Sequence, residues 1–207
     1  MNSKTSTLGP RFDRALVYAH CAHGQQTRKG SEIPYVSHLL GVASIALDLG
    51  ADEDQAVAAL LHDAVEDQGG SARLSDIEKV FGSNVAAIVA DCTDGELDGD
   101  RSDPDNWYPR KEAYLAARKS KPPQSLLVSL ADKTHNARAI LDDLTAIGVA
   151  VFDRFTGGQT GTLWYYATLA TTFCELLPGP GSRRLASIVD QMHRIASADA
   201  PQLCEIQ

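Results

Sequence analysis

Apolar residues recur at helical spacing along nearly the whole chain, and this pattern restricts the fold more than any other feature. Residues 57–65 show it well, with apolar side chains at the i, i+3 and i+4 positions of a helix face that packs into a core. Strand-like alternation is essentially absent, and the one short β-like run, residues 148–152, is too isolated to build a sheet. The sequence therefore predicts an all-α fold, a single helical bundle.

Glycine and proline residues divide the helical pattern into segments. The predicted helices are residues 11–23, 36–49, 53–67, 74–82, 84–92, 110–119, 125–144, 160–177 and 183–196. Residues 94–109 are acidic, rich in turn formers and without helical period, so we expect a long loop there. Such a loop either covers a site or is disordered, and its two aromatic residues, Trp107 and Tyr108, favour packing.

A length of 207 residues suits one domain with one core, which we place at residues 11–197 between tails at 1–10 and 198–207. No apolar run is long enough to span a bilayer, and the N-terminus does not read as a secretory signal. The four cysteines form no C-x-x-C pair, which favours a cytoplasmic protein with reduced thiols. The C-terminal helix could cap the bundle or support an oligomer.

Four polar residues lie next to apolar helical runs and are candidate metal ligands: His38, His62, Asp63 and Asp132. Burying an imidazole or a carboxylate is costly unless a cation, a charge partner or hydrogen bonds compensate it. Each residue alone is more often a satisfied core or surface group, but one metal site accounts for all four together. Two imidazoles and two carboxylates suit Mn²⁺, Fe²⁺ or Co²⁺, and are less diagnostic of Zn²⁺.

Two further carboxylates follow the His62-Asp63 pair at helical spacing. Glu66 is four residues after His62, and Asp67 is four residues after Asp63, so all four should project to neighbouring sides of one helix. A carboxylate so placed can deprotonate or orient a water activated by a metal. The alternative is a solvated helix end.

Basic residues are placed near these candidates although the net charge is −8. Arg28 and Lys29 precede the helix of His38, while Lys133 and Arg138 flank Asp132. The net charge argues against general nucleic-acid binding, which needs an extended basic surface. A small phosphorylated ligand fits a local cluster of basic residues.

The motifs HGQQTRKG (23–30), PYVSH (34–38), ALLHDAVED (59–67) and LADKTHNAR (130–138) occur in one chain and in this order. Together they resemble the hydrolase domain of RelA/SpoT-type enzymes, which belong to the HD metal-dependent phosphohydrolases. The resemblance covers residues 11 to about 175. The chain is too short for the synthetase and regulatory domains of that family, so it is similar to small stand-alone alarmone hydrolases.

This resemblance implies that His38, His62, Asp63 and Asp132 hold one Mn²⁺, and that the enzyme removes the 3′-pyrophosphate of guanosine tetra- or pentaphosphate (ppGpp or pppGpp) to give GDP or GTP. It further implies functional roles for two groups of residues. Glu66 and Asp67 would act on the attacking water, and the substrate would be bound by Arg28, Lys29, Asn136 and Tyr166.

The chain departs from the family pattern at Leu39, where the family often has proline, and at Ala139, where a polar residue is common. The second departure leaves the substrate preference open. The alternatives are a related nucleotide phosphatase, for example one acting on the 2′-phosphate of NADPH, and a module that binds the alarmone without hydrolysing it.

Overall fold

The computed structural model describes residues 8–94 and 103–198. Within these residues the regular structure is helical, apart from one isolated bridge between Thr27 and Pro34. The predicted all-α bundle is therefore confirmed. The α-helices are α1 (Pro10–His23), α2 (Val36–Asp48), α3 (Glu53–Leu61), α4 (Ala64–Asp67), α5 (Gly70–Phe81), α6 (Ser83–Cys92), α7 (Trp107–Arg118), α8 (Pro123–Ile147), α9 (Gly158–Leu176) and α10 (Pro180–Ala198). Two 3-10 helices, η1 (Pro104–Asn106) and η2 (Gly148–Arg154), complete the described elements.

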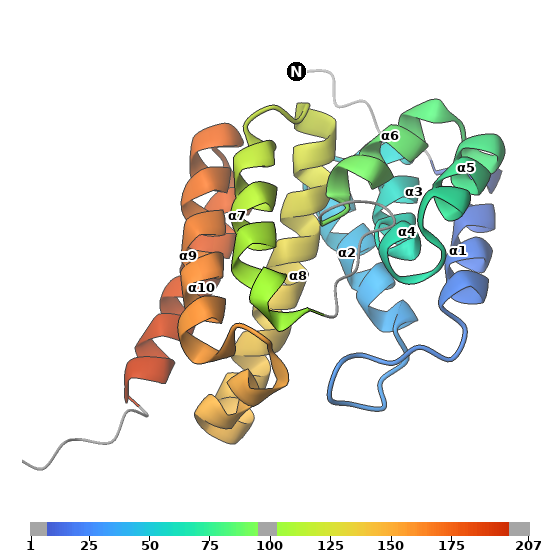
Figure 1. Cartoon of the computed structure of the whole chain (residues 1–207). Helices are drawn as coiled ribbons and strands as arrows, with labels where there is room; N and C mark the ends of the chain where they lie inside the picture. Colours follow the sequence, from blue (N-terminus) through green and yellow to red (C-terminus); the bar gives the residue numbers. More distant parts are fainter. Residues whose placement is uncertain (1–7, 95–102, 199–207) are drawn as a thin grey trace, which may run out of the picture.

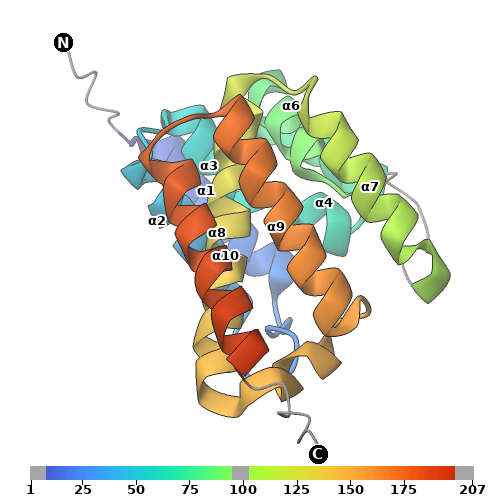
Figure 2. The same ribbon diagram turned by 90° about the vertical axis from the view of Figure 1, so that its left-hand side faces the viewer.

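Helix α8 lies at the centre of the bundle. Helices α1 to α6 gather on one side of it and α7, α9 and α10 on the other (Figure 1). The view turned by 90° shows α10 running along α8, with α9 beside it (Figure 2). A single long helix thus connects the two halves of the molecule.

The buried apolar residues form two clusters rather than the one expected core. Val128 and Ala131 of α8 belong to the first cluster, which α1 to α6 complete. Leu126 and Leu130 of the same helix belong to the second, which is built mainly from α7, α9 and α10. Because α8 contributes one face to each cluster, both depend on its position.

The predicted helix over residues 53–67 is interrupted at its most polar point. Helix α3 ends at Leu61, and α4 starts at Ala64. Residues 62–63 between them form a turn, and Asp63 has φ −95° and ψ −8°, away from the ideal helical values of about −63° and −42°. His62 and Asp63 therefore lie in a turn, and the expectation of one continuous helix is wrong.

The next helix starts earlier than predicted, at Gly70 instead of residue 74. Gly69 adopts φ 131°, a conformation that residues with a side chain rarely adopt, and this lets the chain reverse directly after α4. Two residues, Gln68 and Gly69, therefore suffice to join α4 to α5.

The expected loop at 94–109 is only partly a loop. Residues 95–102 lie outside the described part of the chain, η1 covers Pro104–Asn106, and α7 begins at Trp107. The Trp107 ring occupies the space above two glycines of the η2–α9 region, where a Cβ would lie 2.6 Å from it at Gly157 and 3.0 Å at Gly161. The packing predicted for Trp107 is thus present. The β-like run at 148–152 forms η2 instead of a strand.

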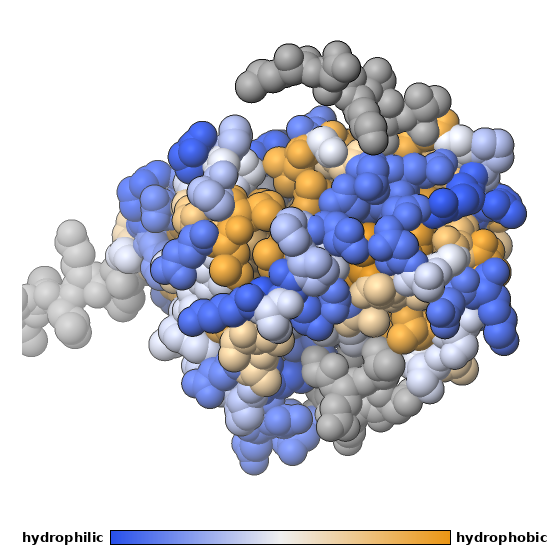
Figure 3. Space-filling view, turned by 90° about the horizontal axis from the view of Figure 1, so that it is seen from above, coloured by the Kyte–Doolittle hydropathy of each residue, from blue (hydrophilic) through white to orange (hydrophobic). Residues whose placement is uncertain are grey.

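The surface seen from above mixes hydrophilic residues with smaller groups of apolar ones (Figure 3). Among the described residues, every helix is too short or too polar to cross a membrane.

Helix α8 offers a stability test. Replacing Leu130, which is 1% exposed, by alanine should destabilise the protein by about 2–5 kcal/mol, because it leaves a cavity between α8 and the second cluster. The same substitution at Leu40, which is 47% exposed on α2, should change stability by less than about 0.5 kcal/mol. Urea unfolding measures both values. Equal effects at the two positions would contradict the central role of α8.

Candidate metal centre and adjoining cavity

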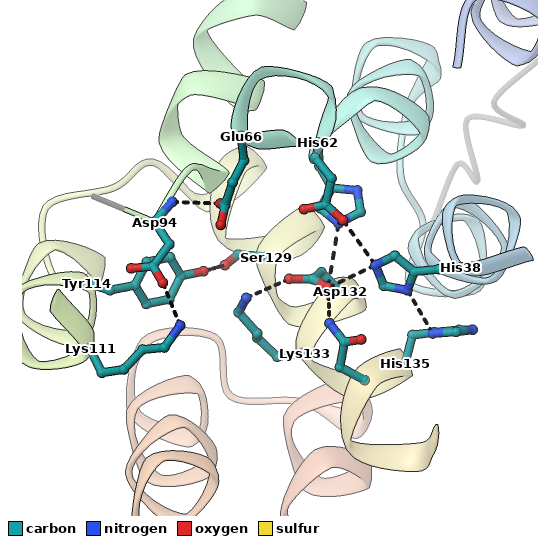
Figure 4. A network of polar contacts seen from close by, with 12 residues as sticks. His38, His62, Glu66, Asp94, Lys111, Tyr114, Ser129, Asp132, Lys133 and His135 are labelled. Carbon is teal, nitrogen blue, oxygen red and sulfur yellow. Dashed lines mark hydrogen bonds and ion pairs between the residues drawn. The ribbon is translucent and has the colours of Figure 1, made fainter. Parts of the chain in front are cut away.

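The four predicted ligands meet at one point, although they come from three separate parts of the chain. Figure 4 shows three of them, His38, His62 and Asp132, turned toward one another. His38 lies in the first turn of α2, His62 and Asp63 lie in the turn after α3, and Asp132 lies in α8. Nε2 of His38 is 3.3 Å from Oδ2 of Asp63 and 3.4 Å from Oδ1 of Asp132. Nε2 of His62 is 2.9 Å and 3.5 Å from the same two oxygens.

This arrangement has the composition of a divalent metal site. Both Nε2 atoms are buried and have no hydrogen-bond partner in the described residues. The Nδ1 atom of His62 is 2.9 Å from the carbonyl oxygen of Ala59, to which it donates, so Nε2 of the neutral ring carries a lone pair. Two imidazole lone pairs and two carboxylates around one point match the needs of a divalent cation.

The electrostatics of the site also favour a positive charge at its centre. Burial lowers the pKa of His62, but the negative charges of Asp63 and Asp132 outweigh burial and raise this pKa well above its usual value. Burial acts to raise the pKa of Asp63, yet His62 and His38 hold it well below its ordinary range. The two carboxylates therefore remain ionised and require a compensating cation or proton.

Asp63 and Asp132 are each held by neighbouring polar groups. The Tyr35 hydroxyl donates to Oδ2 of Asp63 at 2.6 Å. Asn136 Nδ2 donates to Oδ1 of Asp132 at 2.6 Å, and Lys133 Nζ lies 2.7 Å from its other oxygen. Burial opposes ionisation of Asp132, but the charge of Lys133 and the two histidines keep its pKa well below the ordinary value. These contacts fix the orientation of both carboxylates.

His38 is supported by a second histidine. Its Nδ1 is 2.9 Å from Nδ1 of His135, and the two ring centroids are 4.8 Å apart. Burial, together with the neighbouring His38 and Arg28, lowers the pKa of His135 to about 4. A neutral His135 is therefore expected near pH 7.

The two predicted catalytic carboxylates lie on the short helix α4, directly after the ligand turn. Glu66 is half-buried, and its Oε2 accepts a hydrogen bond from the backbone N–H of Asp94 at 3.1 Å. Asp67 is exposed as a residue, and Gln26 donates to its Oδ2 at 2.7 Å. Partial burial of its carboxylate and the charge of Asp63 raise the pKa of Asp67. Both side chains are thus held in place beside the ligand turn.

A cavity of about 590 Å³ adjoins the four-residue site. Tyr35, Lys133, His135 and Asn136, which each contact a candidate ligand, also form part of its wall. Five basic residues line it: Arg28, Lys29, Lys111, Lys133 and Arg154. The cavity wall has only two acidic residues, Asp142 and Asp143, so it is basic although the whole chain is acidic.

The predicted substrate-binding residues lie at this cavity with one exception. Arg28, Lys29, Lys133, Asn136 and Tyr166 all line it. Arg138 is exposed and is not part of the wall. The helical period explains the difference, since position i+4 from Asp132 returns to nearly the same face of α8, whereas position i+6 lies well around the helix.

Several wall residues were not assigned from sequence. His135 lies three residues after Asp132, a spacing that places both on one side of a helix and could have identified it. Lys111 of α7 and Arg154 of η2 had no such signal, because tertiary packing alone brings them to the cavity. Lys111 pairs with Asp94 at 2.5 Å, its Nζ lies 4.8 Å from the Tyr165 ring centroid, and burial lowers its pKa.

The family profile described as an HD domain matches residues 15–154, which include all four candidate ligands. The chain belongs to the HD-domain family. This confirms the family indicated by the sequence motifs.

Curated relatives extend the comparison. The chain is 39% identical over 132 residues to a guanosine-3′,5′-bis(diphosphate) 3′-pyrophosphohydrolase of Drosophila melanogaster, a match that covers 62% of this chain and 68% of that protein. It is 32% identical over 136 residues to the bifunctional (p)ppGpp synthase/hydrolase SpoT of Escherichia coli, covering 63% of this chain but 18% of that protein. The chain thus matches most of the shorter relative and under a fifth of the longer one.

A solved structure shares the HD-domain fold. It belongs to a metazoan SpoT ortholog described as hydrolysing ppGpp, and its TM-score to this chain is 0.67 at 26% identity. The match covers 92% of this chain and 97% of that one. The match therefore extends beyond the region of the family profile.

A thermal-shift measurement tests the metal centre. A divalent cation that binds only the folded HD domain stabilises it by about 4 kcal/mol at 1,000 times its Kd, so Mn²⁺ should raise the Tm. Asp132→Asn should abolish most of this rise, because it removes a ligand charge. The matched control Asp190→Asn, at an exposed position of α10, should keep the rise. An equal rise in all three proteins would place the cation elsewhere.

Proposed function

We propose that this protein is a cytoplasmic, Mn²⁺-dependent hydrolase that removes the 3′-pyrophosphate of ppGpp or pppGpp and yields GDP or GTP. The observation that carries the proposal is the geometry of the site: four converging metal ligands open onto a basic cavity. The activity named for the Drosophila relative, which shares 39% identity, supports the choice of substrate. We assign the hydrolase domain to residues 11–197, since α10 packs against both α8 and α9.

The four ligands His38, His62, Asp63 and Asp132 would hold the cation. A divalent cation supplies Lewis acidity, which polarises a phosphoryl oxygen and makes water a better nucleophile near neutral pH. In the reaction, the oxygen of water forms a bond to the phosphorus attached to the ribose 3′-oxygen. The bond from that phosphorus to the 3′-oxygen breaks, pyrophosphate leaves, and the 3′-oxygen takes up a proton.

Glu66 and Asp67 are the groups that take the proton from the attacking water or orient it. The hydrogen bond from the Asp94 N–H holds Glu66, and the Gln26 amide holds Asp67, so neither carboxylate has to be ordered during the reaction. The raised pKa of Asp67 brings it closer to neutral pH, which makes it a better proton acceptor than an ordinary aspartate.

The basic residues of the cavity would bind the phosphate groups. Lys133 is next to the metal ligands, whereas Lys29 and Arg154 lie with Phe155 in another part of the wall. A substrate with phosphates at both its 3′ and 5′ positions could therefore contact positive charge near the reacting bond and away from it. Tyr166 and Phe155 add aromatic surface for the nucleoside.

A turnover assay tests this activity. The protein with Mn²⁺ should release pyrophosphate from ppGpp, and the chelated protein should not. Glu66→Gln and Asp67→Asn should each lower kcat, by about 10²–10⁴-fold where the residue acts as the general base. The control Glu78→Gln, at an exposed position of α5, should have the activity of the wild type. Phosphate release from NADPH without pyrophosphate release from ppGpp would contradict the proposal.

A second assay tests the basic wall away from the metal. Lys29→Met keeps the aliphatic stem of this exposed residue but removes its charge, so KM for ppGpp should rise about 2- to 10-fold with little change in kcat. The rise should shrink in high salt, which screens exposed charges. Lys119→Met, exposed at the end of α7, is the control. A fall in kcat at unchanged KM would show that Lys29 does more than bind.

A further inference from the structure

His38 differs from the other ligands in how its outer nitrogen is supported. His62 donates to a backbone carbonyl, and the two aspartates accept from Tyr35 and Asn136, all partners whose donor or acceptor role is fixed. His38 instead faces another imidazole, with 2.9 Å between the two Nδ1 atoms. A contact between two ring nitrogens is a hydrogen bond only if one of them carries a hydrogen and the other does not.

The metal site decides which nitrogen carries it. A neutral His38 that offers the Nε2 lone pair to a cation has its hydrogen on Nδ1, so His38 donates. His135 must then accept through an unprotonated Nδ1, which places the hydrogen of its neutral ring on Nε2. The positions of both hydrogens follow from one requirement, that Nε2 of His38 faces Asp63 and Asp132.

The backbone of α2 leaves room for the second ring. Gly41 lies one turn after His38 on the same helix, and a Cβ at this position would collide with Cδ2 and Nε2 of His135. Gly41 has no positive φ, so its backbone conformation does not require glycine. Glycine is needed here because it has no side chain, and the His135 ring occupies the space that a Cβ would fill.

We propose that His135 is a positioning residue for the metal centre, and that Gly41 is the glycine that lets it reach His38. His135 fixes the tautomer and the ring orientation of His38, and it reaches the site because α8 crosses α2 at Gly41. The inference rests on the metal site of the proposed function. It gives His135 and Gly41 roles that the proposed function does not use.

The test is a double-mutant cycle on Mn²⁺ affinity, measured by titration calorimetry on the full chain after chelation. His135→Ala should weaken binding about 10- to 100-fold, as loss of a partner that orients a ligand does. Gly41→Ala should also weaken it, although alanine favours a helix more than glycine does. The double variant should bind no more weakly than His135→Ala alone, because the added methyl group then has no ring to displace.

Two more variants distinguish a role in orienting His38 from a general loss of structure. His135→Gln supplies a side-chain oxygen that can accept from His38 and should recover part of the affinity, while His20→Ala removes an exposed histidine of α1 and should change nothing. Wild-type affinity in His135→Ala, or losses that multiply in the double variant, would overturn the inference and leave the proposed function intact. Mn²⁺ binding without ppGpp hydrolysis by the wild type would overturn the proposed function alone. No Mn²⁺ binding by the wild type would overturn both.

Discussion

The rest of the structure depends on the burial of two imidazoles and one carboxylate, beside a second, half-buried carboxylate, between α2, the α3–α4 turn and α8. Asp132 is 5% exposed and His38 is fully buried, so water cannot stabilise them. Charges in such a place persist only when other groups compensate them. Lys133, Tyr35 and Asn136 provide part of this compensation through direct contacts, and the convergence of four ligand atoms leaves room for a cation to provide the rest.

The need to hold these polar groups together explains why α8 lies at the centre of the bundle. The helix carries Asp132 and its supporting residues on one stretch, and the same stretch contributes Val128 and Leu130 to the two apolar clusters. Movement of α8 would therefore disturb the packing on both sides and the ligand geometry together. A site whose atoms must stay within a few tenths of an ångström benefits from a rigid support of this kind.

The sequence predicted the parts of the structure that local patterns determine. Helical periodicity identified most helices, and the polar residues that follow apolar runs identified His38, His62, Asp63 and Asp132 as candidates. The interruption at Asp63 escaped prediction because the apolar spacing continues across it, so the turn is seen only in the structure. The start of α7 at residues 107–109 was missed because the composition there is that of a loop, and packing of the Trp107 ring against Gly161 of α9 stabilises this first turn.

Residues that only tertiary packing brings together could not be predicted from local sequence patterns. Lys111 reaches the cavity from α7 and Arg154 from η2, and no spacing within either segment points to the metal ligands. Arg138 shows the opposite case, since closeness in sequence to Asp132 suggested it for the site, whereas its helical position leaves it exposed and outside the cavity wall. Spacing predicts a face of one helix, but it does not predict which other elements that face will meet.

The residues that contact the candidate ligands also connect them to the cavity. Tyr35, Lys133, His135 and Asn136 each touch a candidate ligand and also line the cavity. Arg28, another wall residue, donates to Asn136 at 2.8 Å and so reaches Asp132 through it. The wall of the cavity and the candidate ligands are therefore joined by one layer of direct polar contacts.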